Sequence, residues 1–273
     1  MKKRLIWGRY AARRILDKKF HIKLRADRYA GRQMSDIDTA SDKIKEYLKS
    51  GKPFMAGRLG LFETAVMRMY EFEIKKKYAL TMENLYNCAG FFPNDITLGN
   101  RFNEVMQDAL SQTDVYARNE QFLEDYFISK CLPEESCIGR TFGVFDVFDL
   151  KDSWSSALAG KKVLVVSPFT ESISSQYEKR EKLFAGTDIL PAFELKTYKS
   201  LLTVGDLKDD RFDNWFEALD HMKREILAID FDVALLGCGA YGFPLAAEIK
   251  KAGRQAIHMG GVLQILFGVM GRR

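Results

Sequence analysis

The second half of the sequence alternates apolar, strand-like segments with helix-like segments, and this alternation limits the fold more than any other feature. The runs "KKVLVVSPF" (161–169) and "FDVALLG" (231–237) are typical of buried strands. Helical patterns of roughly ten to twenty residues separate such runs, which indicates crossover connections and a mostly parallel sheet with helices on both faces. We therefore expect a Rossmann-like α/β fold. We also expect one helix over 172–186 and a strand over 189–198.

Positive charge is concentrated at the N-terminus. Residues 1–32 contain twelve Lys or Arg and two Asp and so carry +10, whereas the whole chain carries +5 and the remainder therefore −5. A surface for duplex nucleic acid would spread its cations over the folded body, so we expect no nucleic-acid partner. We divide the chain into a basic N-terminal helical arm, residues 1–34, and a single α/β domain, residues 35–273.

The arm interleaves its cations with apolar side chains such as Trp7 and Ile15. This pattern is compatible with a basic amphipathic helix that lies on an anionic membrane surface. The alternative is a helix packed on the domain, or on a partner chain, with its cations in water. The imperfect spacing of the apolar residues leaves both interpretations open.

Cysteine and histidine usage disfavours several classes of site. The four cysteines lie far apart without a C-x-x-C pair, which supports neither a disulfide framework nor a structural zinc site and indicates a reducing, cytoplasmic compartment. The three histidines are also distant from one another, so a His-rich metal site is not expected. Carboxylates could still hold Mg²⁺ or Mn²⁺, and we name no other cofactor.

The segment "FDVALLGCGAYGFPLAAEIKKAG" (231–253) places Gly237-x-Gly239-x-x-Gly242 between a strand and a helix. Such a turn offers backbone amides and the positive end of a helix dipole to a phosphate, and Tyr241 could stack on a base or sugar. His258 ends the next strand, where a dinucleotide site should carry an acid for the ribose, which argues against NAD. The alternative is that the three glycines only form a compact corner.

Polar residues follow two further expected strands. Ser167 and Thr170 come after the strand in 161–169 and could contact a sugar or phosphate, although Thr170 could instead cap its helix. Arg58 and Glu63 follow the short strand "PFMAG". The arginine suits phosphate recognition, and the glutamate suits a general base or a metal ligand. Alternatively, Glu63 complements the N-terminus of its own helix and pairs with Arg58.

Two short motifs resemble the GT-D-fold bacterial glycosyltransferases and related uncharacterised proteins of surface-polysaccharide gene clusters. "RLGLFE" (58–63) is similar to the Arg-Phe-Gly-Asp-Gly-Glu that follows a strand in that family, and "GRQAIHMG" (253–260) is similar to its Gly-x-Gln-Ala-Ile-Asp-x-Gly. The chain departs from the pattern at two acids: Leu61 stands in place of the first acid of the Asp-x-Glu pair, and His258 in place of the later Asp. The first departure puts metal-assisted diphosphate binding in doubt.

The resemblance implies a glycosyltransferase that moves a sugar from a nucleotide-diphosphate donor, with UDP-sugar the first candidate, to a glycan or lipid-linked acceptor in surface polysaccharide synthesis. It implies a cytoplasmic enzyme, with attachment at the inner face of the membrane through residues 1–32 as an alternative. Two other interpretations stay open: a Rossmann-type dehydrogenase or methyltransferase, and a non-catalytic polysaccharide-assembly partner. The expected catalytic residues are Glu63, which is also a possible metal ligand, and Arg58. The expected nucleotide- and phosphate-binding residues are Gly237, Gly239, Ala240, Tyr241, Gly242, His258, Ser167 and Thr170.

Overall fold

A sheet of seven parallel strands forms the centre of the chain in this computed structural model, which describes residues 2–20, 28–207 and 209–270. The order across the sheet is β5-β4-β3-β9-β8-β6-β7, and each neighbouring pair is parallel. The strands are β3 (Phe54–Gly57), β4 (Val115–Ala117), β5 (Cys137–Gly139), β6 (Lys162–Ser167), β7 (Glu194–Lys199), β8 (Val233–Leu236) and β9 (Gln255–His258). A separate antiparallel pair is formed by β1 (Arg28–Tyr29) and β2 (Arg32–Gln33).

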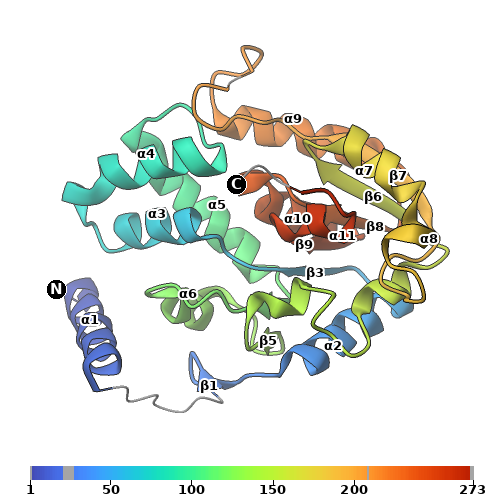
Figure 1. Ribbon diagram of the computed structural model, residues 1–273. Helices are drawn as coiled ribbons and strands as arrows, with labels where there is room; N and C mark the ends of the chain where they lie inside the picture. The colour runs from blue at the N-terminus through green and yellow to red at the C-terminus, as the bar shows by residue number, and fades with distance from the viewer. Residues whose placement is uncertain (1, 21–27, 208, 271–273) are drawn as a thin grey trace.

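Helices cover both faces of this sheet (Figure 1). One face packs against α3 (Leu61–Glu71), α4 (Tyr78–Ala89), α5 (Gly99–Ser111), α6 (Glu124–Cys131), α9 (Trp215–Ala228) and α10 (Gly242–Lys251). The other packs against α2 (Ile37–Ser50), α7 (Thr170–Tyr177), α8 (Arg180–Leu183) and α11 (Val262–Leu266). Strand side chains alternate between the two cores, with Leu164 and Val166 in one and Val163 and Val165 in the other. The α/β fold expected from the sequence is therefore confirmed.

The strand order brings distant parts of the chain together. β9 lies between β3 and β8, so that Ile257 pairs with Ala56 on one side and with Leu235 on the other. Because all three strands are parallel, their carboxyl ends meet at one edge of the sheet. That edge receives the turn after β3 and the glycine turn after β8, which lie 180 residues apart in the sequence (57 against 237).

Local signals explain several helix ends. Asp36 caps α2 by accepting a hydrogen bond of 2.7 Å from the amide of Thr39, and the helix ends at Gly51 in the left-handed region (φ 68°). Two elements are shorter than the sequence predicted. The helix expected over 172–186 is divided into α7 and α8, and the strand expected over 189–198 begins only at Glu194.

The basic arm contains α1 (Lys2–Phe20), and residues 1 and 21–27 lie outside the described part of the chain. α1 packs on the domain through Trp7, whose ring contacts Phe72 and Phe122. In the described residues, no helix combines the length and the hydropathy that a membrane-spanning segment requires.

Candidate active site

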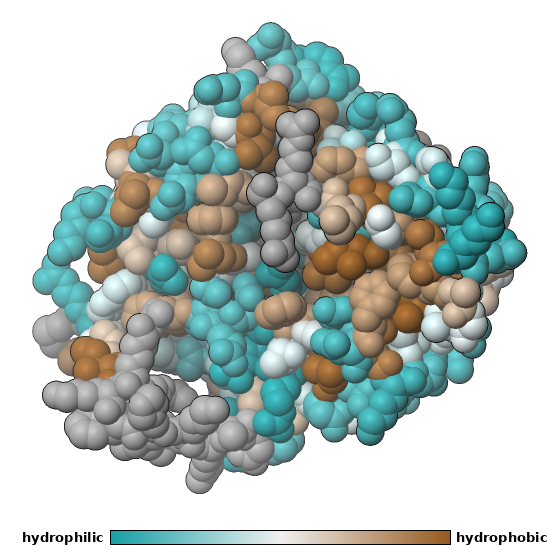
Figure 2. All heavy atoms as spheres, viewed as in Figure 1, coloured by the Kyte–Doolittle hydropathy of each residue, from teal (hydrophilic) through white to brown (hydrophobic). Residues whose placement is uncertain are grey.

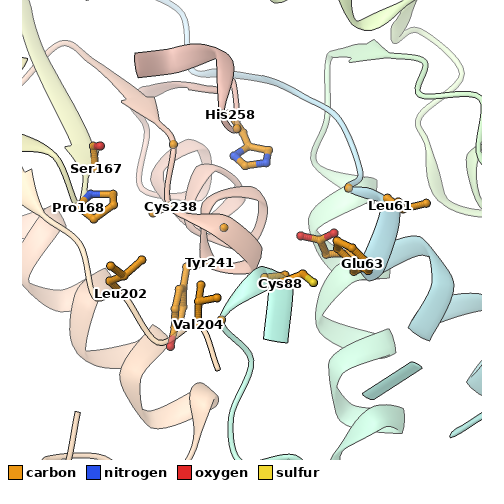
Figure 3. A pocket seen from close by; sticks show the side chains of 18 of the residues that line it. Leu61, Glu63, Cys88, Ser167, Pro168, Leu202, Val204, Cys238, Tyr241 and His258 are labelled. Atoms are coloured by element: carbon orange, nitrogen blue, oxygen red, sulfur yellow. The ribbon is translucent and has the colours of Figure 1, made fainter. Parts of the chain in front are cut away.

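A cavity of about 560 Å³ lies at the carboxyl ends of β3, β4, β6, β8 and β9. This is the edge at which open α/β sheets bind their ligands. Arg58, Glu63, Ser167, Gly237, Gly239, Tyr241 and His258, all expected in the site, line this cavity. Figure 3 shows Ser167 and Glu63 on opposite sides of the space, with His258 between them.

Arg58 directly follows β3 and brings a positive charge to the cavity. Its Nε is buried and has no hydrogen-bond partner among the described residues. The guanidinium lies over the exposed ring of Phe142, 5.9 Å from the centroid, and close to Gly260, where an added Cβ would be 3.4 Å from a terminal nitrogen. The ion pair with Glu63 that we considered is not formed in the described structure. Arg58 therefore retains donors for an anionic ligand.

Glu63 is the third residue of α3, and its carboxylate folds back over the Gly60 that begins the helix. A Cβ at Gly60 would lie 2.0 Å from Oε2, so only glycine leaves room for this arrangement. The side chain is 9% exposed, and this burial raises the pKa of Glu63, while its own backbone amide and the charge of Arg58 oppose the rise. Glu63 thus complements its helix N-terminus, as the alternative interpretation held, and also lines the cavity as a carboxyl group able to exchange a proton.

His258 ends β9 and is 6% exposed, with an Nδ1 that has no hydrogen-bond partner in the described part of the chain. Burial, together with the positive charge of Arg58, lowers the pKa of His258 to about 3. The imidazole is therefore neutral near pH 7. It can exchange hydrogen bonds with a ligand but does not supply positive charge to a phosphate, so its expected phosphate-binding role is reduced to hydrogen bonding.

The glycine turn is tightly packed by other parts of the protein. A Cβ at Gly237 would lie 2.8 Å from the carbonyl oxygen of Gly260, and one at Gly239 would lie 2.6 Å from that of Ala89. Gly239 also has a φ of 59°, which favours glycine. Part of the glycine pattern is therefore explained by close contacts between backbone segments.

The amides of this turn are only partly available to a ligand. The amide of Gly237 donates to the carbonyl of Val166 within the sheet, at 2.9 Å, and that of Gly242 donates to the carbonyl of Gly239. Gly239 is exposed and starts a short 3-10 helix (Gly239–Tyr241), so its amide has no acceptor within that turn. The expected phosphate site is thereby narrowed from the whole turn to the amides at and around Gly239.

Three of the expected binding residues do not line the cavity. Ala240 is buried at 1% exposure, Gly242 is covered by the His258 ring, and Thr170 is buried at the start of α7. A Cβ at Gly242 would lie 2.3 Å from Nδ1 of His258. The structure therefore does not bring these three residues to the cavity, because sequence spacing does not show which side of a turn faces it.

Tyr241 belongs to the wall of the cavity. Its ring is 1% exposed and stacks on Trp215 with centroids 5.2 Å apart, and its hydroxyl lies 2.9 Å from the hydroxyl of Thr203. Because the ring is already stacked and its hydroxyl already paired, Tyr241 is not free to stack on a base. It holds the segment around Thr203 against the glycine turn.

The sequence analysis missed the loop that follows β4. Asn119 and Gln121 line the cavity, and the Asn119 side chain donates to the carbonyl of Leu59 at 3.0 Å. The buried carboxylate of Glu124 holds this loop by accepting hydrogen bonds from the amides of Asn119 and Gln121 at 2.8 and 2.9 Å and from the Tyr116 hydroxyl at 2.6 Å. The run "TDVYAR" (113–118) could have indicated these residues, since the carboxyl end of β4 joins the same edge.

Apolar side chains form part of the rim. Leu61, Phe169 and Leu202 line the cavity with exposed fractions of 50%, 42% and 48%. Figure 2 shows hydrophobic residues on both sides of the middle of the viewed face. A polar interior with an apolar rim suits a substrate that carries both kinds of surface.

The donor set does not fit a divalent cation held by protein ligands alone. Leu61 lines the cavity at the position where the resembling family carries an acid, two residues before Glu63. Among the described residues, no three His, Cys, Asp or Glu side chains are grouped so that they could hold a metal ion. Glu63 is the one carboxylate among the described residues that line the cavity.

Comparison with known proteins gives a likeness of fold. No family model and no curated protein sequence matches the chain. Two solved structures of domain of unknown function 1792 are similar to the chain. One shares 15% sequence identity with it, and the other, which is substituted with selenomethionine, shares 14%. Each alignment covers 89% of this chain and 85% of the other chain, with a TM-score of 0.47. One of them is described as having a distinct glycosyltransferase fold. The chain resembles these domains in fold.

Proposed function

We propose that the chain is a glycosyltransferase that uses a nucleotide-diphosphate sugar, with UDP-sugar the first candidate. The observation that carries the proposal is the convergence, in one cavity, of a guanidinium whose Nε is unpaired among the described residues, the exposed Gly239 and a buried carboxyl group. Sugar transfer leaves negative charge on the departing diphosphate, and donors fixed beforehand at that position lower the barrier most effectively. Arg58 and the amides around Gly239 take this role.

Glu63 is proposed as the group that receives the acceptor's proton. In the reaction, an acceptor hydroxyl forms a bond to the anomeric carbon, the bond from that carbon to the diphosphate breaks, and the bonding electrons leave with the diphosphate. The hydroxyl proton passes to Glu63, because burial raises the pKa of this carboxyl group and so makes its carboxylate a stronger base. Hydrogen bonds from Asn119 and His258 would orient the sugar.

The apolar rim supports an acceptor with a hydrophobic part. We propose a glycan or lipid-linked acceptor used in surface polysaccharide synthesis, in the cytoplasm or at the inner face of the membrane. Leu61, Phe169 and Leu202 are the side chains placed to contact it.

A thermal-shift panel with UDP-, GDP-, CDP- and dTDP-sugars, each with and without Mg²⁺ and Mn²⁺, tests the proposal. A ligand at one hundred times its Kd adds about 2.7 kcal/mol to the stability of the folded state, which shifts Tm by several degrees. We expect such a shift for one nucleotide class, and the diphosphate itself should give much of it. A shift with NADH or S-adenosylmethionine alone would favour the dehydrogenase or methyltransferase interpretation, and no shift at all would favour a non-catalytic assembly partner.

A further inference from the structure

One face of the helix α1 packs on the domain. Trp7 packs edge-on against Phe72 and Phe122 with centroids 5.5 and 5.2 Å away, and the ring of Tyr10 lies 6.4 Å from that of Tyr126. These contacts hold the helix against the end of α3 and the loop that precedes α6. The face with Trp7 and Tyr10 is therefore not available to a partner.

The opposite face of α1 presents an apolar stripe to solvent. Leu5, Gly8, Ala12 and Ile15 are all exposed, and their spacing of three, four and three residues places them along one side of the helix. Leu5 and Ile15 are 63% and 62% exposed, well above the usual exposure of such side chains. Packing on the domain does not account for this stripe.

Cations border the stripe. Helical spacing places Arg4 on one side of it and Arg9 on the other, and both are exposed. Over its whole length α1 contains eight Lys or Arg and one Asp, whereas residues 33–273 carry a net −5. An apolar stripe bordered by cations is the arrangement of helices that lie in the interface of an anionic bilayer, where the cations are attracted to the lipid charge.

We propose that α1 attaches the protein to an anionic membrane surface through Leu5, Ile15 and the bordering arginines while Trp7 stays packed on the domain. Nucleic acid is the less suitable polyanion, because an exposed Leu and Ile gain nothing from a phosphate backbone. Phe122, which contacts Trp7, directly follows the cavity-lining Gln121. Attachment through α1 would thus hold this wall of the cavity near the bilayer. The inference stands without the sugar-transfer proposal, since it uses none of the cavity's chemistry.

Vesicle co-sedimentation of the full chain tests the attachment. We expect binding to vesicles of equal parts phosphatidylglycerol and phosphatidylcholine at low salt, weaker binding at high salt, and little binding to phosphatidylcholine alone. The double variant Leu5→Glu/Ile15→Glu should bind the anionic vesicles at least about tenfold more weakly with an unchanged Tm, because it removes apolar contact and adds repulsion. The matched control is Leu80→Glu/Leu207→Glu, which alters leucines 49% and 55% exposed elsewhere and should bind like the natural chain.

Three results would overturn the proposal: no binding of the natural chain to anionic vesicles, equal loss in the test and control variants, or preferential binding of duplex DNA or RNA in competition. Tryptophan quenching by brominated lipid tests the orientation, because Trp154 and Trp215 are fully buried. The variant Leu5→Trp in a Trp7→Phe background should be strongly quenched, whereas Trp7 in the natural chain should not. Strong quenching of Trp7 would show that the helix leaves the domain and would contradict the proposed docked arrangement. The nucleotide-sugar panel is independent of all these results.

Discussion

Two turns meet at the carboxyl edge of the sheet, one after β3 and one after β8, and they differ in what they contribute to the site. The turn after β8 has the recognisable glycine pattern, yet its glycines are closely packed by Ala89, Gly260 and His258. The turn after β3 has a less recognisable sequence, yet it supplies the unpaired Arg58 and the buried Glu63. A glycine motif can thus mark where segments pack, while the reactive groups come from the neighbouring turn.

The largest effect should follow from Glu63→Gln. If Glu63 accepts the acceptor's proton, loss of the carboxylate lowers the transfer rate about 10²- to 10⁴-fold, since general bases contribute that much. Nucleotide affinity should change little. The measurement is release of free nucleotide from the donor sugar that the thermal-shift panel identifies, and Glu83→Gln, on the exposed side of α4, is the matched control.

The pH dependence of stability gives Glu63→Gln a second readout. The pKa of Glu63 is raised in the folded state by burial, so the folded state binds this proton more tightly than the unfolded state does. The stability that this contributes is present at low pH and is lost as pH rises through the raised pKa. The Gln variant should therefore gain stability relative to the natural chain as pH rises, and a constant difference between pH 4 and 8 would contradict burial of an ionisable Glu63.

Arg58→Ala should weaken the binding of a nucleotide diphosphate without lowering the stability of the folded protein. Loss of charge-assisted hydrogen bonds, worth about 1.5–3 kcal/mol, should weaken nucleotide diphosphate binding roughly 10- to 100-fold by calorimetry. The Tm of the free protein should stay the same or rise, because Nε has no partner to lose. Arg58→Lys should recover part of the affinity, and Arg224→Ala, exposed on α9, should leave it unchanged. Unchanged affinity in Arg58→Ala would remove the turn after β3 from the diphosphate site.

Gly242→Ala should lower the stability of the folded protein, whereas Arg58→Ala should not. The added methyl group would meet the imidazole of His258 at 2.3 Å, and overpacking of this kind costs about 1–3 kcal/mol. Gly261→Ala is the matched control, because nothing lies within 4 Å of its Cβ position and its φ is −65°. Chemical denaturation of both variants measures the difference. Equal stability would mean that the turn after β8 is looser than its contacts indicate.

The smallest expected effect is a gain of metal dependence in the variant Leu61→Asp. The substitution places a second carboxylate on the cavity side of α3, two residues from Glu63. We expect nucleotide affinity to become dependent on Mn²⁺ or Mg²⁺, which the natural chain should show weakly or not at all. Leu80→Asp, an equally exposed leucine on α4, is the control. If the natural chain already needs the metal as strongly as the variant, the phosphates themselves must hold it.

Much of the fold could be predicted because its signals are local. The strand over 231–237 and the helix ending at Gly51 need only hydrophobic runs and a left-handed glycine to be recognised. The composition of the site could not be predicted in the same way, because it depends on the order of the strands in the sheet, which no local signal encodes. The position of β9 between β3 and β8 brings Arg58 beside His258, and contacts across that order decide that Gly239 faces the cavity whereas Gly242 does not.

A crystal structure with UDP or a UDP-sugar tests the central claim most directly. The account predicts that the diphosphate lies between the guanidinium of Arg58 and the amide of Gly239, with the sugar beside Glu63. A diphosphate bound elsewhere, for example in the second cavity of about 330 Å³ that residues of α5, α9 and α10 line, would contradict it and leave the glycine turn with a packing role alone.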